Sequence, residues 1–280
     1  MSNRTVYKFV PDIHLQIKNN HHQVVKFGSC LNILDEIKEG SITIIVTSPP
    51  YDLNKSYGKY VDTVGIERWK TLISETTQKV YKALKPNGSF FLNVSPIPDP
   101  KTKEIIPLGS IAYDIIKQNG FYLRNMIVWN FNNMVNCVNR LSGRYENILW
   151  CVKDINNYIF NLDDIRIPYI TKKDKRLDPS GGRNPTDSWY FDRVNNMTKK
   201  KFNIQHPTVY PTPMIERIVK MSSHENDWIL DPFLGSGTTL IAAANNNRNG
   251  IGIELDEQYK SLIVRRLEVE VNLQGKFFNS

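Results

Sequence analysis

The segment from Trp228 to Thr238 has the pattern of a strand, a glycine-rich turn and a helix in immediate succession. The apolar run Trp228-Ile229-Leu230 leads into Asp231–Gly237, and a helical pattern begins at Thr238. Glycines are needed where the backbone approaches a ligand closely or takes a positive φ. The free N–H groups of the following helix suit a carboxylate or a similar group. The pattern therefore predicts a ligand-binding turn in an α/β sheet.

An acidic residue follows this turn at the end of the next predicted strand, where Glu254 comes after Gly250–Ile253. A carboxylate at this place can accept hydrogen bonds from both hydroxyls of a ribose. The turn has neither the Gly-Lys-Ser/Thr of a phosphate-binding loop nor the GxGxxG spacing of a dinucleotide site. A cofactor with one ribose and an amino acid group fits better, which predicts S-adenosylmethionine. The less specific interpretation is a tight β–α turn followed by an ordinary glutamate.

The rest of the chain alternates apolar, β-branched runs with segments of helical spacing. Such alternation predicts a doubly wound, mostly parallel α/β sheet. We expect strands at Val24–Phe27, Ser41–Val46, Phe90–Val94, Tyr122–Trp129, Asn147–Val152, Trp228–Leu230 and Gly250–Ile253, and helices at Leu31–Ile37, Glu67–Leu84, Leu108–Lys117, Pro213–Met221, Thr238–Asn245 and Glu257–Val269.

A second motif, Thr47-Ser48-Pro49-Pro50-Tyr51, directly follows the predicted strand Ser41–Val46. Ligands in open α/β sheets bind beyond the carboxyl ends of the strands. The two prolines fix φ and carry no N–H, which leaves this corner rich in hydrogen-bond acceptors. The Ser48 hydroxyl and the Pro49 carbonyl can accept the two protons of an aromatic amine whose ring stacks on Tyr51. The less specific interpretation is a proline turn that ends a strand.

The chemistry of an exocyclic base amine explains why such a corner is useful. The nitrogen is a poor nucleophile because its lone pair is delocalised into the ring. Acceptors placed off the ring plane favour a pyramidal nitrogen whose lone pair points at a sulfonium methyl group. The base must leave the duplex stack to reach them.

Together, the two motifs resemble the β class of amino-methylating DNA methyltransferases of bacterial restriction-modification systems. In that class the Pro-Pro-Tyr motif precedes the glycine-rich turn, a circular permutation relative to other classes, and the order is the same here. The similarity covers most of the chain from about Val24 onward. It includes Leu84–Ser89, Tyr145–Leu149, Asp187–Trp189 and His206–Thr208.

The resemblance implies a Rossmann-like, circularly permuted methyltransferase sheet with a small target-recognition insertion. Residues 24–153 would form the catalytic half and residues 206–280 the cofactor-binding half. Residues 154–205 are polar and lysine-rich without a regular period, and we interpret them as the insertion. Residues 1–23 lack a clear period and are interpreted as an N-terminal arm.

The resemblance also assigns site residues. Two departures affect the cofactor pocket, since Gly28-Ser29 replaces the usual Gly-Asp and His206–Pro211 replaces the usual His-Pro-Thr-Gln-Lys-Pro. The segment His206–Pro213 would close over the methionine end of the cofactor. We expect the cofactor to be bound by Ser29, His206, Thr208, Asp231, Pro232, Phe233, Gly235, Ser236, Gly237, Thr238 and Glu254, and the flipped base to be held by Ser48, Pro49, Pro50 and Tyr51.

The net charge of +8 is compatible with a polyanionic partner, although charge alone does not identify one. A charge run is more often a solvated face. As candidate DNA contacts we take Arg140 and Arg144 in a possible loop after Trp129, and Lys172, Lys173, Lys175, Arg176, Lys199, Lys200 and Lys201 in the expected insertion.

The three cysteines, Cys30, Cys137 and Cys151, form no CxxC pair and none follows a proline. They indicate neither a disulfide framework nor a zinc site, and we expect them to be core or semi-buried residues. Methylation of a cytosine ring carbon would need a thiolate nucleophile, usually in a Pro-Cys motif, so this chemistry is not expected. No metal site is expected.

The chain lacks a long apolar run and a secretory signal at its start, which favours a cytoplasmic protein.

We therefore predict site-specific methyl transfer from S-adenosylmethionine to N4 of a flipped cytosine in double-stranded DNA. Family members with serine at the position of Ser48 mostly methylate cytosine N4, whereas aspartate or asparagine usually accompanies adenine N6. Adenine N6 is the nearest alternative, followed by a non-catalytic DNA-binding modification subunit and by RNA or protein methylation. We expect a monomer or homodimer, with a cognate restriction endonuclease encoded alongside but not a stable subunit.

Overall fold

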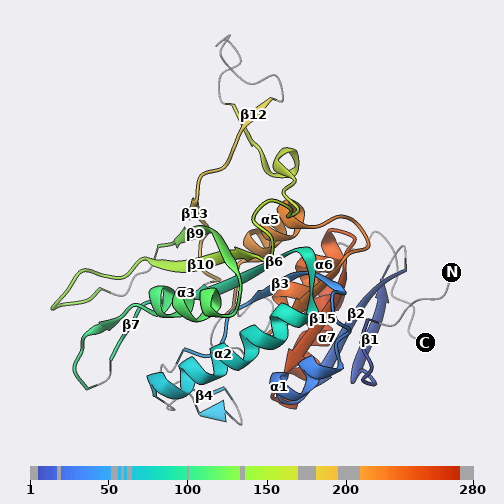
Figure 1. The fold of residues 1–280 in the computed structure, drawn as a ribbon, viewed down its shortest axis with the longest axis horizontal. Coiled ribbons are helices and arrows are strands. Elements are labelled where there is room, and N and C mark those ends of the chain that lie inside the picture. Colours follow the sequence, from blue (N-terminus) through green and yellow to red (C-terminus); the bar gives the residue numbers. More distant parts are fainter. Residues whose placement is uncertain are drawn as a thin grey trace.

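A computed structural model describes residues 6–17, 20–51, 56–57, 60–61, 65–99, 101–132, 136–169, 181–194 and 209–271. The described residues build a central nine-stranded sheet (Figure 1). Its strands are, in spatial order, β1 (Ile13–Ile17), β2 (His21–Phe27), β15 (Asn249–Glu254), β14 (Trp228–Asp231), β3 (Ile42–Thr47), β6 (Leu84–Val94), β10 (Tyr145–Val152), β9 (Tyr122–Asn130) and β13 (Ser188–Tyr190).

The centre of this sheet is parallel. Strands β2, β15, β14, β3 and β6 run in the same direction, whereas β1 and β10 are antiparallel to their neighbours. Strands covered on both faces read as continuous apolar runs, and all six residues of β3 are buried. The predicted doubly wound, mostly parallel α/β fold is confirmed.

Helices cover both faces of the sheet. Helices α2 and α3 lie over the near face in Figure 1, and they pack with α1 into one core cluster. Helices α5, α6 and α7 pack into two clusters on the opposite face. The helices are α1 (Cys30–Ile33), α2 (Ile66–Ala83), α3 (Leu108–Gln118), α5 (Thr212–Ser222), α6 (Thr238–Asn245) and α7 (Lys260–Glu270).

Short elements complete the described chain. Three of them are 3-10 turns and six are two-residue strands outside the main sheet. They are η2 (Leu34–Glu36), η3 (Leu162–Ile165), η4 (Glu257–Tyr259), β4 (Ser56–Tyr57), β5 (Tyr60–Val61), β7 (Ile97–Pro98), β8 (Ile105–Ile106), β11 (Ile167–Pro168) and β12 (Gly182–Arg183).

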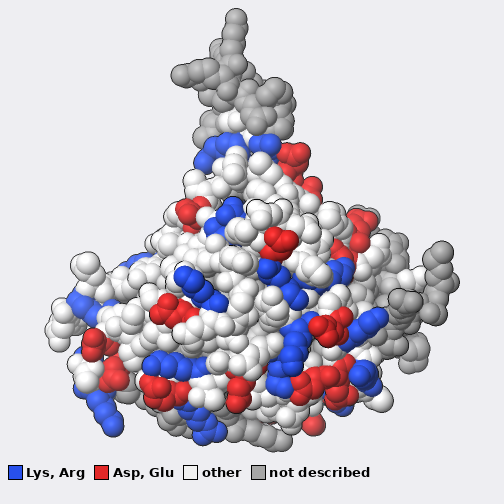
Figure 2. All heavy atoms as spheres, viewed as in Figure 1, with Lys and Arg blue, Asp and Glu red and all other residues white. Residues whose placement is uncertain are grey.

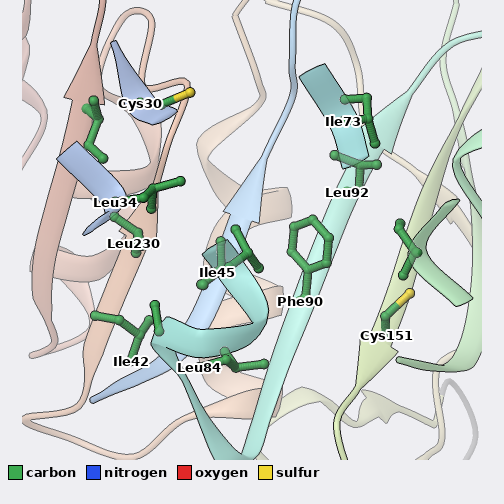
Figure 3. Close-up of a cluster of buried hydrophobic side chains, with 14 of the residues drawn as sticks. Cys30, Leu34, Ile42, Ile45, Ile73, Leu84, Phe90, Leu92, Cys151 and Leu230 are labelled. Carbon is green, nitrogen blue, oxygen red and sulfur yellow. The ribbon is translucent and has the colours of Figure 1, made fainter. Parts of the chain in front are cut away.

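Two of the three cysteines belong to the core. Figure 3 shows Cys30 and Cys151 in the cluster formed around Ile45 and Phe90 of β3 and β6. Burial raises the pKa of the Cys30 thiol to about 12, and it raises the pKa of Cys151 as well. Cys137 is partly exposed, and all three thiols are free. Their expected role as core or semi-buried residues is confirmed.

The chain order places a switch point between β3 and β14. From β3 the chain passes through α2 to β6 on one side, and from β14 through α6 to β15 on the other. Because these strands are parallel, their carboxyl ends at Thr47, Asp231 and Glu254 meet at one edge of the sheet. Open α/β sheets bind ligands at this position.

Three segments differ from the expectations drawn from the sequence. Residues 13–17 and 21–23, expected in an N-terminal arm, form β1 and the start of β2 in the main sheet. Strand β6 runs through Pro86–Gly88, between the helix expected to end at Leu84 and the strand expected to begin at Phe90, and the irregular pairing with β3 between Ile42 and Ile44 accommodates it. Within the expected insertion, β12 lies on a segment that projects from the body (Figure 1), whereas β13 pairs with β9.

No helix in the described ranges has both the length and the apolar character needed to cross a bilayer.

Candidate active site

A cavity of about 210 Å³ lies at the switch point and brings the two sequence motifs together. One wall comes from the corner after β3, and the other comes from the turn after β14. The lining residues are Gly28, Ser29, Cys30, Ser48, Pro49, Pro50, Tyr51, Leu72, Pro232, Phe233, Gly235, Glu254, Leu255 and Tyr259. Nine residues expected to hold the base or the cofactor are therefore in one place.

Asp231 joins the two walls from behind the cavity. Its carboxylate accepts hydrogen bonds from the Thr47 hydroxyl at 2.6 Å, the Thr239 hydroxyl at 2.6 Å and the Phe233 N–H at 3.0 Å. Asp231 is 1% exposed, and this burial raises its pKa to about 6. It is not among the residues that line the cavity, so its contribution here is to fix the turn to the end of β3.

Glu254 faces the cavity from the end of β15. Its two carboxylate oxygens accept hydrogen bonds from the Gly235 N–H at 2.7 Å and the Asp256 N–H at 3.0 Å. Burial raises the pKa of Glu254 to about 7. Its backbone carbonyl accepts from the Gly28 N–H at 2.8 Å, which holds Gly28 and Ser29 at the rim. The predicted acidic partner of the glycine-rich turn is thus hydrogen-bonded to that turn.

Ser236 and Thr238 point away from the cavity. Their hydroxyl oxygens accept hydrogen bonds from Arg266, at 2.8 Å and 2.9 Å. Arg266 is 2% exposed and also makes a bidentate ion pair with Glu270. Gly237, at a φ of +87°, ends the turn in the left-handed region. The hydrogen bonds from Arg266 therefore hold the glycine-rich turn in place. Sequence reasoning missed Arg266, because its only local pattern is an arginine and a glutamate four residues apart.

A buried polar network extends from the Tyr51 hydroxyl. Tyr51 donates to the Asn93 carbonyl at 2.9 Å and accepts from the Asn93 side-chain amide at 2.7 Å, and its hydroxyl also contacts that of Ser48. The same Asn93 amide donates to Glu146 at 2.6 Å, and Glu146 accepts from Arg193 at 2.6 Å. Sequence reasoning missed Asn93 and Glu146, because only the pairing of β6 with β10 makes them neighbours. It missed Arg193 because this residue follows β13, a strand that was not expected.

One buried polar atom of this network, Oδ1 of Asn93, has no hydrogen-bond partner among the described residues. Tyr210, just before α5, hydrogen-bonds to Ser48, and burial raises the pKa of Tyr210 well above the usual value. An unpaired buried polar group costs about 1–3 kcal/mol.

The expected DNA contacts are only partly described. Arg140 is exposed and Arg144 partly exposed in the loop between β9 and β10. On the face shown in Figure 2, lysine and arginine side chains are interspersed with acidic ones, so no single basic patch dominates that face. The other candidates lie outside the described residues, namely Lys172, Lys173, Lys175, Arg176, Lys199, Lys200 and Lys201, as do the expected cofactor residues His206 and Thr208.

The sheet and its cavity define a Rossmann-like methyltransferase. The sequence profile of the DNA methylase family matches residues 42–265, and the chain belongs to this family. Among its relatives, the type II methyltransferase M.ScaI of Streptomyces caespitosus is 35% identical over 250 residues, covering 87% of this chain and 80% of the relative. The DNA adenine methyltransferase YhdJ of Escherichia coli is 30% identical over 260 residues, covering 89% and 84%.

Solved structures agree in fold. The PvuII DNA methyltransferase, described as cytosine-N4-specific, has a TM-score of 0.73 at 18% identity, covering 95% of this chain and 92% of that chain. Similar structures include complexes with S-adenosyl-L-methionine. The cofactor of this family member is S-adenosyl-L-methionine, as the glycine-rich turn predicted. The cavity suits it chemically, since it offers a carboxylate at Glu254 and aromatic rings at Phe233 and Tyr259.

Cofactor binding should weaken as the pH falls. The pKa of Glu254 is raised to about 7, so the carboxylate that accepts hydrogen bonds from ribose hydroxyls is lost below that pH. We expect the Kd of S-adenosylmethionine to rise about tenfold from pH 8 to pH 6. Titration calorimetry in a pH series measures this dissociation constant.

Two variants control the experiment. Glu254→Gln should bind the cofactor weakly with a flat pH profile, whereas Glu257→Gln, an exposed neighbour, should behave as the parent protein. A parent Kd that does not change with pH would contradict this role.

Proposed function

We propose that this DNA methylase transfers a methyl group from S-adenosylmethionine to N4 of a cytosine flipped out of double-stranded DNA. The observation that carries the proposal is the single cavity shared by Ser48–Tyr51 and by Phe233, Gly235 and Glu254. A base held by the first wall faces a cofactor held by the second, so no covalent intermediate with the protein is needed.

The Tyr51 network favours Ser48 as an acceptor. A tyrosine hydroxyl has one proton to donate and two lone pairs. The proton of Tyr51 goes to the Asn93 carbonyl, and one lone pair accepts from the Asn93 amide. The remaining lone pair then accepts the proton of the adjacent Ser48 hydroxyl. Tyr210 also hydrogen-bonds to Ser48, and, with the Ser48 proton directed at Tyr51, one lone pair of Ser48 is left for an amine of the substrate.

Glu146 keeps the Asn93 amide in this orientation. A carboxylate can only accept, so the Asn93 nitrogen and not its oxygen must face Glu146. The same nitrogen then donates to Tyr51. Arg193 neutralises the charge of Glu146, which is 7% exposed. This order of donors and acceptors supports the assignment of Ser48 as an acceptor of the base amine.

When bound, S-adenosylmethionine supplies a methyl group attached to positively charged sulfur. Ser48 and Pro49 hold the amine so that the nitrogen lone pair points at this group. The new N–C bond would form as the S–C bond broke, with the bonding pair left on sulfur and one proton of the nitrogen passed to water. Tyr51 offers a flat ring for stacking, and Glu254 holds the ribose. Asp231, Ser236, Gly237 and Thr238 act by keeping the turn in place.

Adenine N6 is the second candidate target. Serine before Pro-Pro-Tyr favours cytosine, and the structurally similar PvuII enzyme is described as cytosine-N4-specific. A relative at 30% identity, however, is described as a DNA adenine methyltransferase. The chemistry of the corner serves either amine, so the target base must be measured.

The test is identification of the methylated nucleoside. The full-length protein is incubated with duplex DNA and S-adenosylmethionine carrying a labelled methyl group. The DNA is digested, and the nucleosides are separated and analysed by mass spectrometry. Labelled N4-methylcytosine is the expected product. Labelled N6-methyladenine would replace the cytosine assignment, and absence of label from every DNA would favour a non-catalytic subunit.

The remaining proposals concern the surroundings of the reaction. We infer a cytoplasmic monomer or homodimer with a restriction endonuclease encoded alongside. We also infer that residues 154–205 contribute to target recognition. The basic residues proposed to bind phosphates are Arg140, Arg144, Lys172, Lys173, Lys175, Arg176, Lys199, Lys200 and Lys201.

A further inference from the structure

The loop between β9 and β10 carries two aliphatic side chains that the protein leaves in water. Val138 is 96% exposed and Leu141 is 93% exposed, the highest values among the exposed large hydrophobic residues described. Contact between apolar side chains and water is unfavourable. Two aliphatic groups this exposed, three residues apart in one loop, make this tip a candidate surface for a partner.

The tip of this loop is held in place by hydrogen bonds across its base. The Phe131 N–H donates to the Arg144 carbonyl at 3.1 Å, where the two strands part. Further along, the Cys137 N–H donates to the Ser142 hydroxyl at 3.0 Å, and Arg144 donates to the Asn136 side chain at 3.1 Å. These bonds enclose Val138–Leu141, whose four residues are all exposed. The tip thus presents both aliphatic groups outward.

The loop begins beside the candidate active site. Strand β10 is antiparallel to β6, with Asn147 opposite Val94, so its first residues lie at the carboxyl end of β6. Glu146, next to the root of the loop, hydrogen-bonds to Asn93 and through it to Tyr51. In Figure 1 the loop extends beyond the body on the same side as the hairpin of β7 and β8.

The composition of the loop suits a polyanion. Residues 131–144 contain two arginines and no acidic residue. Arg140 lies between the two aliphatic residues, and Arg144 lies at the root. Arginine contacts phosphates, whereas aliphatic side chains of DNA-binding proteins enter between unstacked bases. A base that leaves the helix creates such a gap next to its former neighbours.

We propose that the tip Val138–Leu141 enters the DNA duplex and fills the space vacated by the flipped target base. Val138 and Leu141 replace the lost stacking contacts, and Arg140 and Arg144 bind the flanking phosphates. The inference rests on the proposed function, because only a base-flipping enzyme creates this gap.

The experiment compares the double variant Val138→Ala/Leu141→Ala with the parent protein on two DNA duplexes. One is an unmethylated duplex that contains the target sequence, which is identified by base-resolution sequencing of DNA treated with the parent. The other has the target base mispaired, which makes it easy to flip. We expect the variant to lose about tenfold or more in kcat/KM on the paired duplex and little on the mispaired one. Both substitutions are at exposed positions, so an unchanged thermal midpoint is expected.

Val10→Ala is the matched control, because Val10 is also an exposed aliphatic residue, at 79%, and precedes β1 at the far edge of the sheet. It should match the parent on both duplexes. Equal rates for variant and parent on the paired duplex would overturn the proposal, as would an equal loss on both duplexes. Sedimentation compares the self-association of the variant with that of the parent. A parent that self-associates and a variant that does not would overturn the proposal, because the tip would then form a contact between two copies of the protein. If base-resolution sequencing finds no site methylated by the parent, the proposed function itself fails.

Discussion

Replacing Ser48 with alanine should lower kcat for methyl transfer by about 100- to 1000-fold, the usual effect of removing one acceptor or donor aimed at a reacting group. The variant keeps the Pro49 carbonyl but loses the acceptor that favours a pyramidal amine. Its Kd for S-adenosylmethionine should stay unchanged, because Glu254 and Phe233 remain. Single-turnover transfer of labelled methyl to DNA, together with calorimetry for the cofactor, separates the two effects.

The matched control is Ser110→Ala, an exposed serine in α3 that is far along the chain from either motif. It should transfer methyl groups at the parent rate. If Ser48→Ala retained more than about a tenth of the parent rate, the acceptor role of Ser48 would be wrong. A loss of cofactor affinity equal to the loss in rate would instead place Ser48 in the cofactor pocket.

The second large effect concerns stability. Asp231→Ala should lower the free energy of unfolding by about 3 kcal/mol or more, because it leaves two hydroxyls and one N–H without their buried acceptor. These groups are Thr47, Thr239 and the Phe233 backbone, which connect β3, α6 and the glycine-rich turn. Cofactor affinity should fall by at least about tenfold as the turn loosens. Denaturant unfolding and calorimetry measure both quantities.

Two further variants make this result interpretable. Asp231→Asn retains one acceptor oxygen, so it should be intermediate in both stability and cofactor affinity. Asp163→Ala removes an acid whose side chain is 81% exposed and paired with Arg166, and it should change stability by less than about 0.5 kcal/mol. A loss for Asp231→Ala no larger than that of Asp163→Ala would refute the bracing role.

The fold was predictable where the local pattern is strong. Strand β3 is a continuous β-branched run, and α6 begins and ends where its glycine turn and asparagines indicated. Strand β1 alternates strictly between apolar and polar residues over Ile13–Ile17, which is the pattern of a strand with one face exposed, and this signal was overlooked. Strand β13 has three residues and depends on pairing with β9, which no local pattern reveals.

The candidate site was predictable for a different reason. Residues that follow parallel strands meet at one edge of the sheet, which places Ser48, Tyr51, Phe233 and Glu254 in one cavity. The supporting network was not predictable, because Asn93 and Glu146 meet only through an antiparallel pair of strands. The bracing of Ser236 by buried Arg266 likewise depends on how α7 packs against the turn.

The most direct test is a crystal structure of the protein with a cofactor analogue and an unmethylated duplex that contains the target sequence. We expect the target cytosine outside the helix, with its N4 amine within hydrogen-bond reach of the Ser48 hydroxyl and the Pro49 carbonyl. The nitrogen should lie about 3–3.5 Å from the position of the transferable methyl group. A base that remains stacked in the duplex, or a cofactor bound away from Glu254, would contradict a single shared site.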